Sequence, residues 1–375
     1  MPIVVLVAPD KFKGTLTARE AALAIAKGWK KARPADQLEL APISDGGDGF
    51  GAVLSGLWGA KERIVRTVDA AHRPLRARWW WEPKRRAAIV ESAAVIGLAQ
   101  LPPKRFHPFD LDTYGLGQVI RAARREGAQR CVIGIGGSAT NDGGFGVARA
   151  LGWQFLDAGG QVIERWTDLQ KLRQVIRPKR SERFPQVTVA VDVQNPLLGR
   201  KGATRIYGPQ KGLRTADFAK AERRLRRLAE VVARELGFDG RKLCGAGAAG
   251  GLGFGLAAFL GARLEPGFDL FAREARLIAK IRRADIVVTG EGRLDESTAM
   301  GKGAGELARI CSQMRIPCIG LAGEVAPARK LKVFSQTAGL TDLTSAKAAK
   351  GQAQIWLARL AEIIARRWNK TVPDW

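Results

Sequence analysis

The sequence has few of the residues on which many kinds of enzyme chemistry depend. Its 375 residues include two histidines, His72 and His107, and both stand near prolines in segments that read as loops. The sequence therefore disfavours a Ser-His-Asp hydrolase and a histidine-ligated zinc site. The four cysteines show no C-x-x-C spacing and fit reduced thiols in the cytoplasm.

Long apolar runs and several common sequence motifs are also missing. No apolar segment approaches the roughly 20 residues needed to cross a bilayer. The start, "MPIVVLVAPD", has neither the basic region nor the cleavage site of a signal peptide. We therefore expect a cytoplasmic protein without a membrane partner. The Walker A pattern and the H-R-D and D-F-G motifs are absent, which excludes P-loop and protein-kinase mechanisms.

Acidic residues are outnumbered by basic ones, 36 to 62, and the formal net charge is +26. Such an excess suggests nucleic-acid binding, but the basic residues occur in scattered pairs and triplets. In the segment 221–237, Leu225, Leu228, Val231 and Val232 share one helical face, so the arginines form its solvated side. No nucleic-acid-binding module is recognisable, and we expect no specific nucleic-acid partner.

Glycine, in contrast, is abundant, with 44 residues that gather in short clusters. One cluster, "GAGAAGGLG" at 245–253, contains G-x-G-x-x-G through Gly245, Gly247 and Gly250, the phosphate-binding pattern of dinucleotide folds. That pattern requires an apolar strand before the first glycine, whereas "LGFDGRKLC" precedes it here. The sequence therefore disfavours a nicotinamide or flavin enzyme.

Apolar runs that end in polar or glycine-rich turns recur along the chain, and helical patterns lie between most of them. This alternation predicts a parallel α/β architecture, in which ligands bind beyond the carboxyl ends of the strands. Thr17 and Glu20 form a capping box that predicts a helix ending before Pro34. A second helix is predicted over "YGLGQVIRAARREGA", closed by Gly127.

Residues 62–97 differ, because they read as strands joined by a tight turn and predict an antiparallel region on a second domain. The tryptophans at 79–81 alternate across one of these strands and are expected to pack a core or an interface. The chain is long enough for two domains that share a cleft. We place the terminal α/β domain at 1–62 plus 280–375 and an inserted α/β domain at 63–279.

A protein that handles a nucleoside triphosphate needs converging backbone N–H donors, cations and carboxylates that hold Mg²⁺. The turn "GIGGSATNDGG" follows an apolar strand and precedes a helical pattern, which predicts an anion-binding nest. The residues proposed to hold nucleotide phosphates in this turn are Gly136, Gly137, Ser138, Ala139, Thr140, Asn141 and Asp142. Gly245, Gly247 and Gly250 are a second candidate, although close packing of the following helix also explains them.

Charged residues gather at the same turns. Basic residues that could neutralise phosphate or a substrate carboxylate are Lys11, Lys13, Lys211, Arg293 and Lys302. Carboxylates follow successive strands at Asp10, Asp45, Asp48, Asp142, Asp192, Glu291 and Asp295. A single lysine or aspartate at a turn is by default an exposed or turn-forming residue. Converging carboxylates in an α/β cleft favour Mg²⁺ binding and activation of a hydroxyl nucleophile, which is the chemistry of phosphoryl transfer.

Taken in order, these turns resemble one known family. The segments "APDKFKGTLTA", "PISDGGDG", "TYGLGQ", "GIGGSATNDGG", "VDVQNPLLG", "GPQKG", "GAGAAGGLG" and "TGEGRLD" are similar, in the same order, to those of the two-domain bacterial glycerate kinases. The resemblance runs from Ile3 to about Gly323. It implies a flavodoxin-like parallel-sheet domain and a mixed-sheet, restriction-enzyme-like domain, with the active site in the cleft between them.

The resemblance also implies ATP- and Mg²⁺-dependent phosphorylation of D-glycerate, more often to 2-phosphoglycerate than to 3-phosphoglycerate, by a monomer or homodimer. Asp192, at the end of a strand, would accept the hydroxyl proton. Lys13 and Lys302 would offset charge on the transferring phosphoryl group, and Arg293 would grip the substrate carboxylate. The expected Mg²⁺ ligands are Asp45, Asp295 and Glu291, and Asp45 also counts among the catalytic candidates. Further substrate-binding candidates are Asp10, Asn195 and Ser138.

The sequence departs from the family pattern at several of these turns. Members commonly have "ADGGEGT", where this chain has Asp48 in place of the glutamate and Phe50 in place of the threonine. Near Lys302, Ser297 replaces a usual glutamine, and Gly303 and Ala304 replace a valine and a proline. Substrate preference is therefore less secure than reaction type. The alternatives are a kinase for another small hydroxy acid and a basic nucleic-acid-binding protein derived from the kinase fold.

Overall fold

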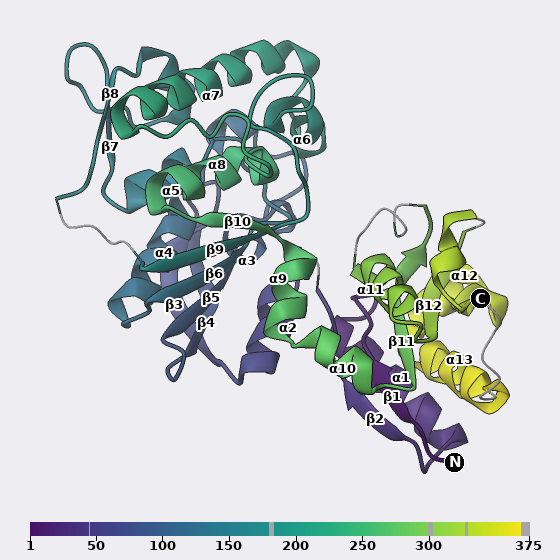
Figure 1. Ribbon diagram of the computed structural model, residues 1–375. Helices are drawn as coiled ribbons and strands as arrows, with labels where there is room; N and C mark the ends of the chain where they lie inside the picture. Colours follow the sequence, from purple (N-terminus) through teal and green to yellow (C-terminus); the bar gives the residue numbers. More distant parts are fainter. Residues whose placement is uncertain (45, 180–183, 297, 299–302, 327–328, 369–375) are drawn as a thin grey trace. The chain divides into compact units, whose positions relative to one another are not determined.

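Figure 1 shows the computed structural model of the chain, which divides into two compact units. The terminal unit consists of residues 1–45 and 268–375, and the inserted unit of residues 46–267. The structure describes residues 1–44, 46–179, 184–296, 298, 303–326 and 329–368. In that part of the chain, no helix combines the length and the apolar character that crossing a membrane requires.

The terminal unit is built on a five-stranded sheet in which every neighbouring pair is parallel. The strands are β1 (Val4–Val7), β2 (Gln37–Leu40), β11 (Ile286–Leu294), β12 (Cys318–Val325) and β13 (Gln336–Gly339). Their order across the sheet is β13-β12-β11-β1-β2. Counted along this unit, that is 2-1-3-4-5, the order of flavodoxin-like folds. The predicted parallel-sheet domain is confirmed.

Helices cover the sheet of the terminal unit. They are α1 (Ala18–Ala32), α9 (Gly267–Glu274), α10 (Leu277–Arg283), α11 (Gly303–Gln313), α12 (Ala346–Gly351) and α13 (Ala353–Arg367), with 3-10 turns η5 (Arg329–Val333) and η6 (Leu340–Asp342). The capping box of Thr17 and Glu20 starts α1 as predicted. Helices α1 and α13 pack together over the sheet. Their backbones approach closely at Gly28, where a Cβ would lie 1.9 Å from the carbonyl oxygen of Ala358.

The inserted unit contains a six-stranded mixed sheet. Its strands are β3 (Lys61–Val68), β4 (Pro74–Glu82), β5 (Ala87–Glu91), β6 (Arg130–Gly134), β9 (Gln186–Val191) and β10 (Arg263–Pro266), in the order β10-β9-β6-β5-β4-β3. β3, β4 and β5 are antiparallel neighbours, as predicted for 62–97, whereas β5, β6, β9 and β10 run parallel. β7 (Gln154–Leu156) and β8 (Gln174–Ile176) form a separate two-stranded sheet. The predicted mixed sheet is confirmed.

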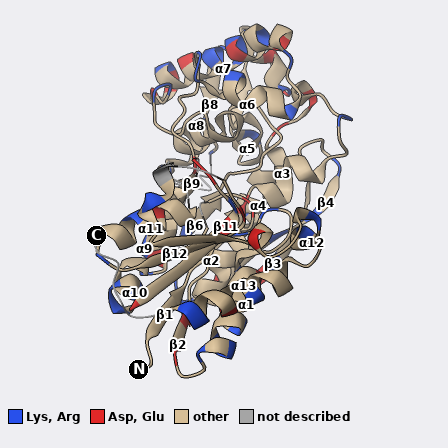
Figure 2. Ribbon diagram, turned by 90° about the vertical axis from the view of Figure 1, so that its right-hand side faces the viewer, with Lys and Arg blue, Asp and Glu red and all other residues tan. Residues whose placement is uncertain are grey.

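Helices and 3-10 turns complete the inserted unit. They are α2 (Phe50–Trp58), α3 (Ala93–Ile96), α4 (Tyr114–Arg125), α5 (Phe145–Ala150), α6 (Ala203–Lys211), α7 (Thr215–Leu236), α8 (Ala248–Leu260), η1 (Leu98–Gln100), η2 (Pro108–Asp110) and η3 (Trp166–Lys171). Trp79 and Trp81 join the main core, and Trp80 packs against Gly51 of α2 on the other face, so the tryptophans are core residues as expected. Leu225 and Val232 of α7 are fully buried, while basic and acidic residues line its outer side (Figure 2).

The borders between the units differ from the expected positions at 62 and 280. Residues 46–62 include α2, which packs on β4 and β5 of the six-stranded sheet and therefore belongs to the inserted unit. Residues 268–279 lie in the terminal unit. The borders carry glycine and charged residues, "SDGGDG" at 44–49 and "EPGFD" at 265–269, but similar clusters occur at other turns of the chain, so composition alone does not mark the borders.

Candidate active site

The parallel strands of the inserted unit deliver several polar residues to one edge of the sheet. Glu91 is the last residue of β5 and pairs with Gly134, the last residue of β6. Gly134 in turn pairs with Ala190 of β9, and Asp192 directly follows that strand. Because parallel strands end at the same edge, Glu91, the turn after Gly134 and Asp192 all lie at this carboxyl edge.

The glycine-rich segment that opens the inserted unit lies across the carboxyl edge. A Cβ on Gly46 would be 3.1 Å from Oδ1 of Asp192, and one on Gly136 would be 2.7 Å from Cα of Gly47. Glu91 fixes the segment, because its carboxylate accepts hydrogen bonds from the N–H groups of Gly49 (2.8 Å) and Gly51 (3.0 Å) at the start of α2. Burial raises the pKa of Glu91, and the nearby carboxylate of Asp48 adds to the effect.

The predicted phosphate-binding turn at 136–142 follows β6 at this edge. It is tied to the segment before it, because Leu98 donates its N–H to the Gly137 carbonyl (2.9 Å) and Ala139 donates to Ile96 (2.8 Å). Within the described chain, the backbone N–H groups of Gly136, Ser138 and Thr140 have no hydrogen-bond acceptor. Unsatisfied N–H groups in a turn are suited to binding an anion.

Asp142 and Asn141, at the end of this turn, are fully buried. The Asp142 carboxylate accepts hydrogen bonds from Thr113 and from the N–H groups of Gly144 and Gly146, so it joins the starts of α4 and α5. Burial, with a contribution from the Asp112 carboxylate, raises the pKa of Asp142 to about 6. Through these hydrogen bonds, the Asp142 oxygens stabilise the conformation of the turn.

Two buried side-chain oxygens of the turn have no donor. Asn141 uses its amide N–H to donate to Thr204 (3.1 Å). Its Oδ1, and Oγ1 of Thr140, have no hydrogen-bond partner among the described residues. Unpaired buried polar atoms are rare in folded proteins and commonly mark a place for water or a ligand.

The second glycine turn, at 245–250, serves mainly to let loops approach one another. No strand leads into it, since residues 237–244 are irregular, and this agrees with the rejection of a dinucleotide fold. Gly247 donates its N–H to the Asn195 carbonyl (2.9 Å), and Gly143 donates to the Gly250 carbonyl (3.1 Å). A Cβ on Gly250 would lie 2.0 Å from the Thr140 carbonyl oxygen. The glycines therefore clamp the 136–142 turn and the loop after β9.

Asp192 and Asn195, both selected from the sequence, come together with Tyr207 of α6, which was not. The Tyr207 hydroxyl donates to Oδ1 of Asn195 (2.5 Å), and the Asn195 amide donates to the carbonyl of Lys201 (2.7 Å). Burial and the negative charge of Asp192 raise the pKa of Tyr207. Asp192 itself is exposed, so a substrate hydroxyl can reach it.

Lys211 is the residue whose position the sequence misjudged. A lysine in the turn-like "GPQKG" is expected to be exposed, yet α6 continues through Pro209 and Lys211 is 6% exposed. Its Nζ donates to Oγ of Ser138 (3.0 Å) and to the Thr140 carbonyl (2.7 Å), so it touches the phosphate-binding turn. Burial lowers the pKa of Lys211 to about 7, partly offset by Asp142.

Asp10, Lys13, Glu291, Arg293 and Asp295, the predicted residues of the terminal unit that the structure describes, lie at the carboxyl edge of the terminal sheet. Asp10, beyond β1, is buried, and its N–H donates to the Gly290 carbonyl of β11 (2.8 Å). At the start of α11, a Cβ on Gly303 would be 2.7 Å from Oδ2 of Asp10. Lys13 is exposed, and its backbone packs against Gly292. Glycine in place of the family's valine at 303 therefore gives the Asp10 carboxylate room.

Glu291 and Asp295, two of the expected Mg²⁺ ligands, are linked by Thr298. The Thr298 hydroxyl donates to Glu291 (2.8 Å) and accepts from the N–H of Asp295 (3.2 Å). The guanidinium of Arg293 lies between Asp295 (3.8 Å) and Glu324 (3.7 Å). Asp45 and Lys302, the other candidates of this unit, lie outside the described residues.

The described residues include few side chains that could bind Mg²⁺ together. Among them, no three side chains of histidine, cysteine, aspartate or glutamate gather as a metal-binding group. Mg²⁺ in phosphoryl-transfer sites typically takes one or two carboxylates and completes its shell with phosphate oxygens and water. The pair Glu291 and Asp295 is compatible with such a site, which would depend on a nucleotide for its remaining ligands.

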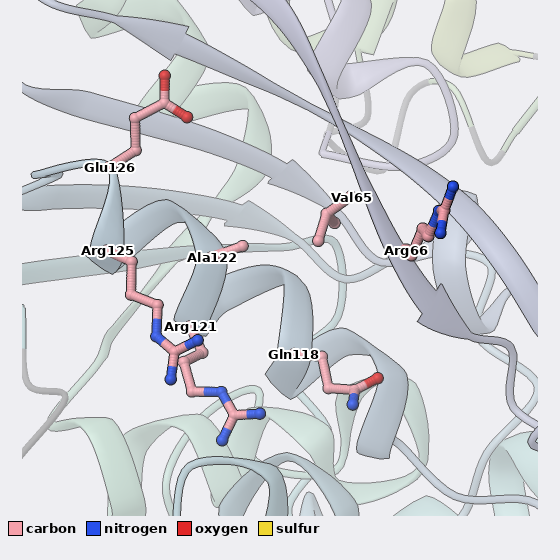
Figure 3. Close-up of a pocket in the computed structure, with 7 residues that line it drawn as sticks. All are labelled: Val65, Arg66, Gln118, Arg121, Ala122, Arg125 and Glu126. Atoms are coloured by element: carbon pink, nitrogen blue, oxygen red, sulfur yellow. The ribbon is translucent and has the colours of Figure 1, made fainter.

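Two pockets lie in the inserted unit. One, of about 800 Å³, is lined by residues of the segments 98–107 and 209–212 with Leu111, and includes Lys211. The other, of about 440 Å³, lies between β3 and α4, where Arg121 and Arg125 stand side by side and Arg66 stands apart (Figure 3). No predicted site residue lines this arginine pocket, and α4 leads into the amino end of β6, away from the carboxyl edge.

Comparison with known proteins gives a consistent result. Residues 5–369 match the profile of the glycerate kinase family. The chain is 38% identical over 325 residues to a glycerate kinase of Halalkalibacterium halodurans, covering 86% of this chain and 85% of the relative. It is 37% identical over 325 residues to a glycerate 2-kinase of Escherichia coli, with the same coverage of both chains.

A solved structure extends the similarity to the fold. A protein from Salmonella typhimurium LT2, named as a candidate glycerate kinase 2, superposes with a TM-score of 0.85 at 32% sequence identity. The match covers 97% of this chain and 98% of the other. The likeness therefore spans both units.

Proposed function

The chain belongs to the glycerate kinase family, and we propose on this premise that it transfers the γ-phosphoryl group of ATP to the 2-hydroxyl of D-glycerate. Membership makes it a kinase. The choice of carbon is supported by the Escherichia coli relative, whose name is glycerate 2-kinase. The observation that carries the proposal is the carboxyl edge of the six-stranded sheet, where exposed Asp192 and the N–H groups of the 136–140 turn lie together.

In the proposed reaction, the hydroxyl oxygen of glycerate attacks the γ-phosphorus, and the bond from that phosphorus to the oxygen shared with the β-phosphate breaks. The hydroxyl proton passes to the Asp192 carboxylate. The products are phosphoglycerate and ADP. Asn195, held by Tyr207 and Lys201, fixes the loop that presents Asp192. Ser138 and Asn195 bind the substrate in this proposal.

Each unit contains candidate ligands for the charges of the nucleotide. The N–H groups of the 136–140 turn hold phosphate oxygens, because such donors are already unpaired there. Glu291 and Asp295, with Asp45, would hold Mg²⁺, which would neutralise charge on the phosphates. Lys13 and Lys302 would offset charge on the transferring group, and Arg293, with Asp10, would bind the substrate carboxylate.

A coupled assay with ATP and D-glycerate tests the proposal. ADP formation that requires D-glycerate, with NMR showing phosphate on the carbon-2 oxygen, is the expected result. Phosphate on carbon 3 would contradict the regiochemistry alone. The assay run with other small hydroxy acids tests the alternative substrate class, because the departures from the family pattern at Asp48, Phe50 and Gly303 make substrate preference less secure than reaction type. Absence of turnover with every acid, together with salt-sensitive binding to duplex DNA, would contradict the kinase.

The same proposal includes a cytoplasmic enzyme that works as a monomer or homodimer. Light scattering at assay concentration measures the second point. A larger assembly would contradict it without affecting the proposed reaction.

A further inference from the structure

We propose that the 800 Å³ pocket beside Lys211 binds the nucleoside part of ATP, with the phosphates directed past Lys211 toward the 136–140 turn. This inference rests on the proposed function. Neither the family match nor the named relatives assign a place to the nucleotide base. The argument uses the walls of the pocket, its charge, its attachment to the turn and its direction.

The walls are apolar and the volume suits a nucleoside. Pockets that enclose small organic ligands commonly measure about 300–1,000 Å³ and are lined mostly by apolar side chains. Leu98, Leu101, Pro102 and Phe106 contribute such walls, and Leu98 is 40% exposed, so a ligand can reach it. Phe106 adds an aromatic side chain to the wall.

The charges of the pocket favour an anion. Among its lining residues, all of which are described, none is acidic, and Lys104, Arg105 and Lys211 are basic. Arg105 lies over the Phe106 ring at 5.8 Å, and Arg73 lies over the same ring at 5.4 Å. An apolar wall next to several cations matches a molecule with an aromatic base and a polyphosphate chain.

The pocket is joined directly to the phosphate-binding turn. Its wall begins at Leu98, which donates its N–H to Gly137, and the preceding Ile96 accepts from Ala139. On the other side, Lys211 donates to Ser138 and to the Thr140 carbonyl. A nucleotide in the pocket therefore reaches the N–H groups of the turn without leaving the protein surface.

Helix α6 gives the nucleotide its direction. Lys211 and Tyr207 stand four residues apart, so they share a face of the helix about 6 Å apart along its axis. Tyr207 bonds to Asn195, and the charge of Asp192 reaches its hydroxyl. The line from the pocket through Lys211 thus leads to the proposed proton acceptor.

The arginine pocket of Figure 3 lacks these features. It has three arginines, but its apolar lining is limited to Val65 and Ala122, which form no wall for a base, and no candidate site residue borders it. It provides the matched control, because Arg125→Glu makes the same charge change as Arg105→Glu on an exposed residue of the same unit.

The test is calorimetric binding of MgATP to the full chain without glycerate, followed by steady-state kinetics. Leu98→Trp fills the pocket and is expected to weaken MgATP binding at least about tenfold. Arg105→Glu is expected to weaken it about threefold to tenfold. Arg125→Glu should stay within twofold, and the KM for D-glycerate should change little in all three. Thermal unfolding verifies that each variant folds. If Leu98→Trp does not fold, Arg105→Glu still tests the proposal, because Arg105 is exposed.

The outcomes separate the pocket from the function. If the wild type phosphorylates D-glycerate and both pocket variants bind MgATP normally, the pocket assignment is overturned and the kinase stands. Weakened binding in a protein that phosphorylates no glycerate supports the pocket and contradicts the substrate. Equal loss in Arg125→Glu points to general charge and overturns the pocket. Failure of folded wild-type protein to bind MgATP contradicts both.

Discussion

At the carboxyl edge of the six-stranded sheet, polar groups are buried and bonded to backbone, whereas at the same edge of the five-stranded sheet many are exposed charges that pair at longer range. Glu91, Asp142 and Lys211 are each less than 10% exposed. The side chains of Arg293 and Glu324 are more than half exposed and lie 3.7 Å apart. Burial shifts proton affinities in the first group, while solvent screens the second. The inserted unit therefore presents polar groups that burial and hydrogen bonds hold in place. The terminal unit presents charged groups that solvent screens.

Asp192→Asn should have the largest effect, because it removes the proposed proton acceptor while leaving the shape of the edge unchanged. We expect turnover to fall by a factor on the order of 10² or more, with MgATP affinity preserved. Single-turnover kinetics measure this loss. Asp239→Asn is the control, since Asp239 pairs with Arg241 on the surface. A near-normal rate would remove Asp192 from the role.

Asp142→Asn tests whether burial governs the charges of the inserted unit. Because the folded-state pKa of about 6 lies above the ordinary value of 3.8, this carboxyl stabilises the fold most below pH 4, and that contribution is lost as pH rises through 6. The unfolding free energy of the wild type should fall relative to the variant by up to about 1.4 kcal/mol per pH unit in this window.

Urea unfolding at several pH values between 4 and 6 measures that difference. Asp239→Asn again serves as control, because ion pairing with Arg241 lowers the pKa of Asp239 to about 2. Its contribution changes only as pH falls toward that value. If the unfolding free energies of wild type and Asp142→Asn change equally with pH, Asp142 is not buried as described.

Lys211→Met should reduce kcat/KM for ATP by about tenfold, the value of one charge-assisted contact. Burial lowers the pKa of free Lys211 to about 7, and a bound polyphosphate would raise it. Wild-type ATP affinity should then decline as pH rises above 7, and the variant should lack that decline. Calorimetry in buffers of different ionisation enthalpy should detect proton uptake by wild type alone. Equal pH profiles would contradict a phosphate contact.

Thr298→Val should have the smallest effect, because it removes the hydroxyl that donates to Glu291 and accepts from Asp295 but leaves every charged group in place. Losing the link between Glu291 and Asp295 is expected to raise the half-saturating Mg²⁺ concentration by up to about fivefold, with little change in turnover at saturating metal. Thr67→Val is a control, because its hydroxyl bonds Gly115 and Gln118 in the other unit. Unchanged metal dependence would argue against Glu291 and Asp295 as ligands.

The sequence predicted those parts of the molecule whose signals are local. The helix α1 was recognisable from its capping box, and the 62–97 strands from their alternation and turn. The burial of Lys211 could not be predicted, because Pro209 and the flanking glycines indicate a turn, and only the contact with Ser138 and Thr140 makes the lysine internal. Tyr207 and Thr298 were missed for the same reason, since their roles depend on partners brought together by the fold.

The unit borders and the glycine turn at 245–250 show a second limit of prediction from the sequence. The chain enters and leaves the inserted unit through turns that contain glycine and charged residues, but such turns also occur elsewhere in the chain. The turn has the spacing of a nucleotide fingerprint, yet its glycines are required by the close approach of the Thr140 and Pro196 carbonyl groups. Spacing alone does not distinguish backbone that binds a ligand from backbone that touches another loop.

The inserted unit also begins and ends at one place. A Cβ on Gly46 would lie 3.2 Å from Cα of Gly267, although 220 residues separate the two positions in the sequence. A module with touching ends can be excised, exchanged or circularly permuted with only a short splice. A gene segment that codes for residues 46–267 could thus be moved to another gene as one piece. The terminal unit left behind would need only a new hairpin to join its two parts.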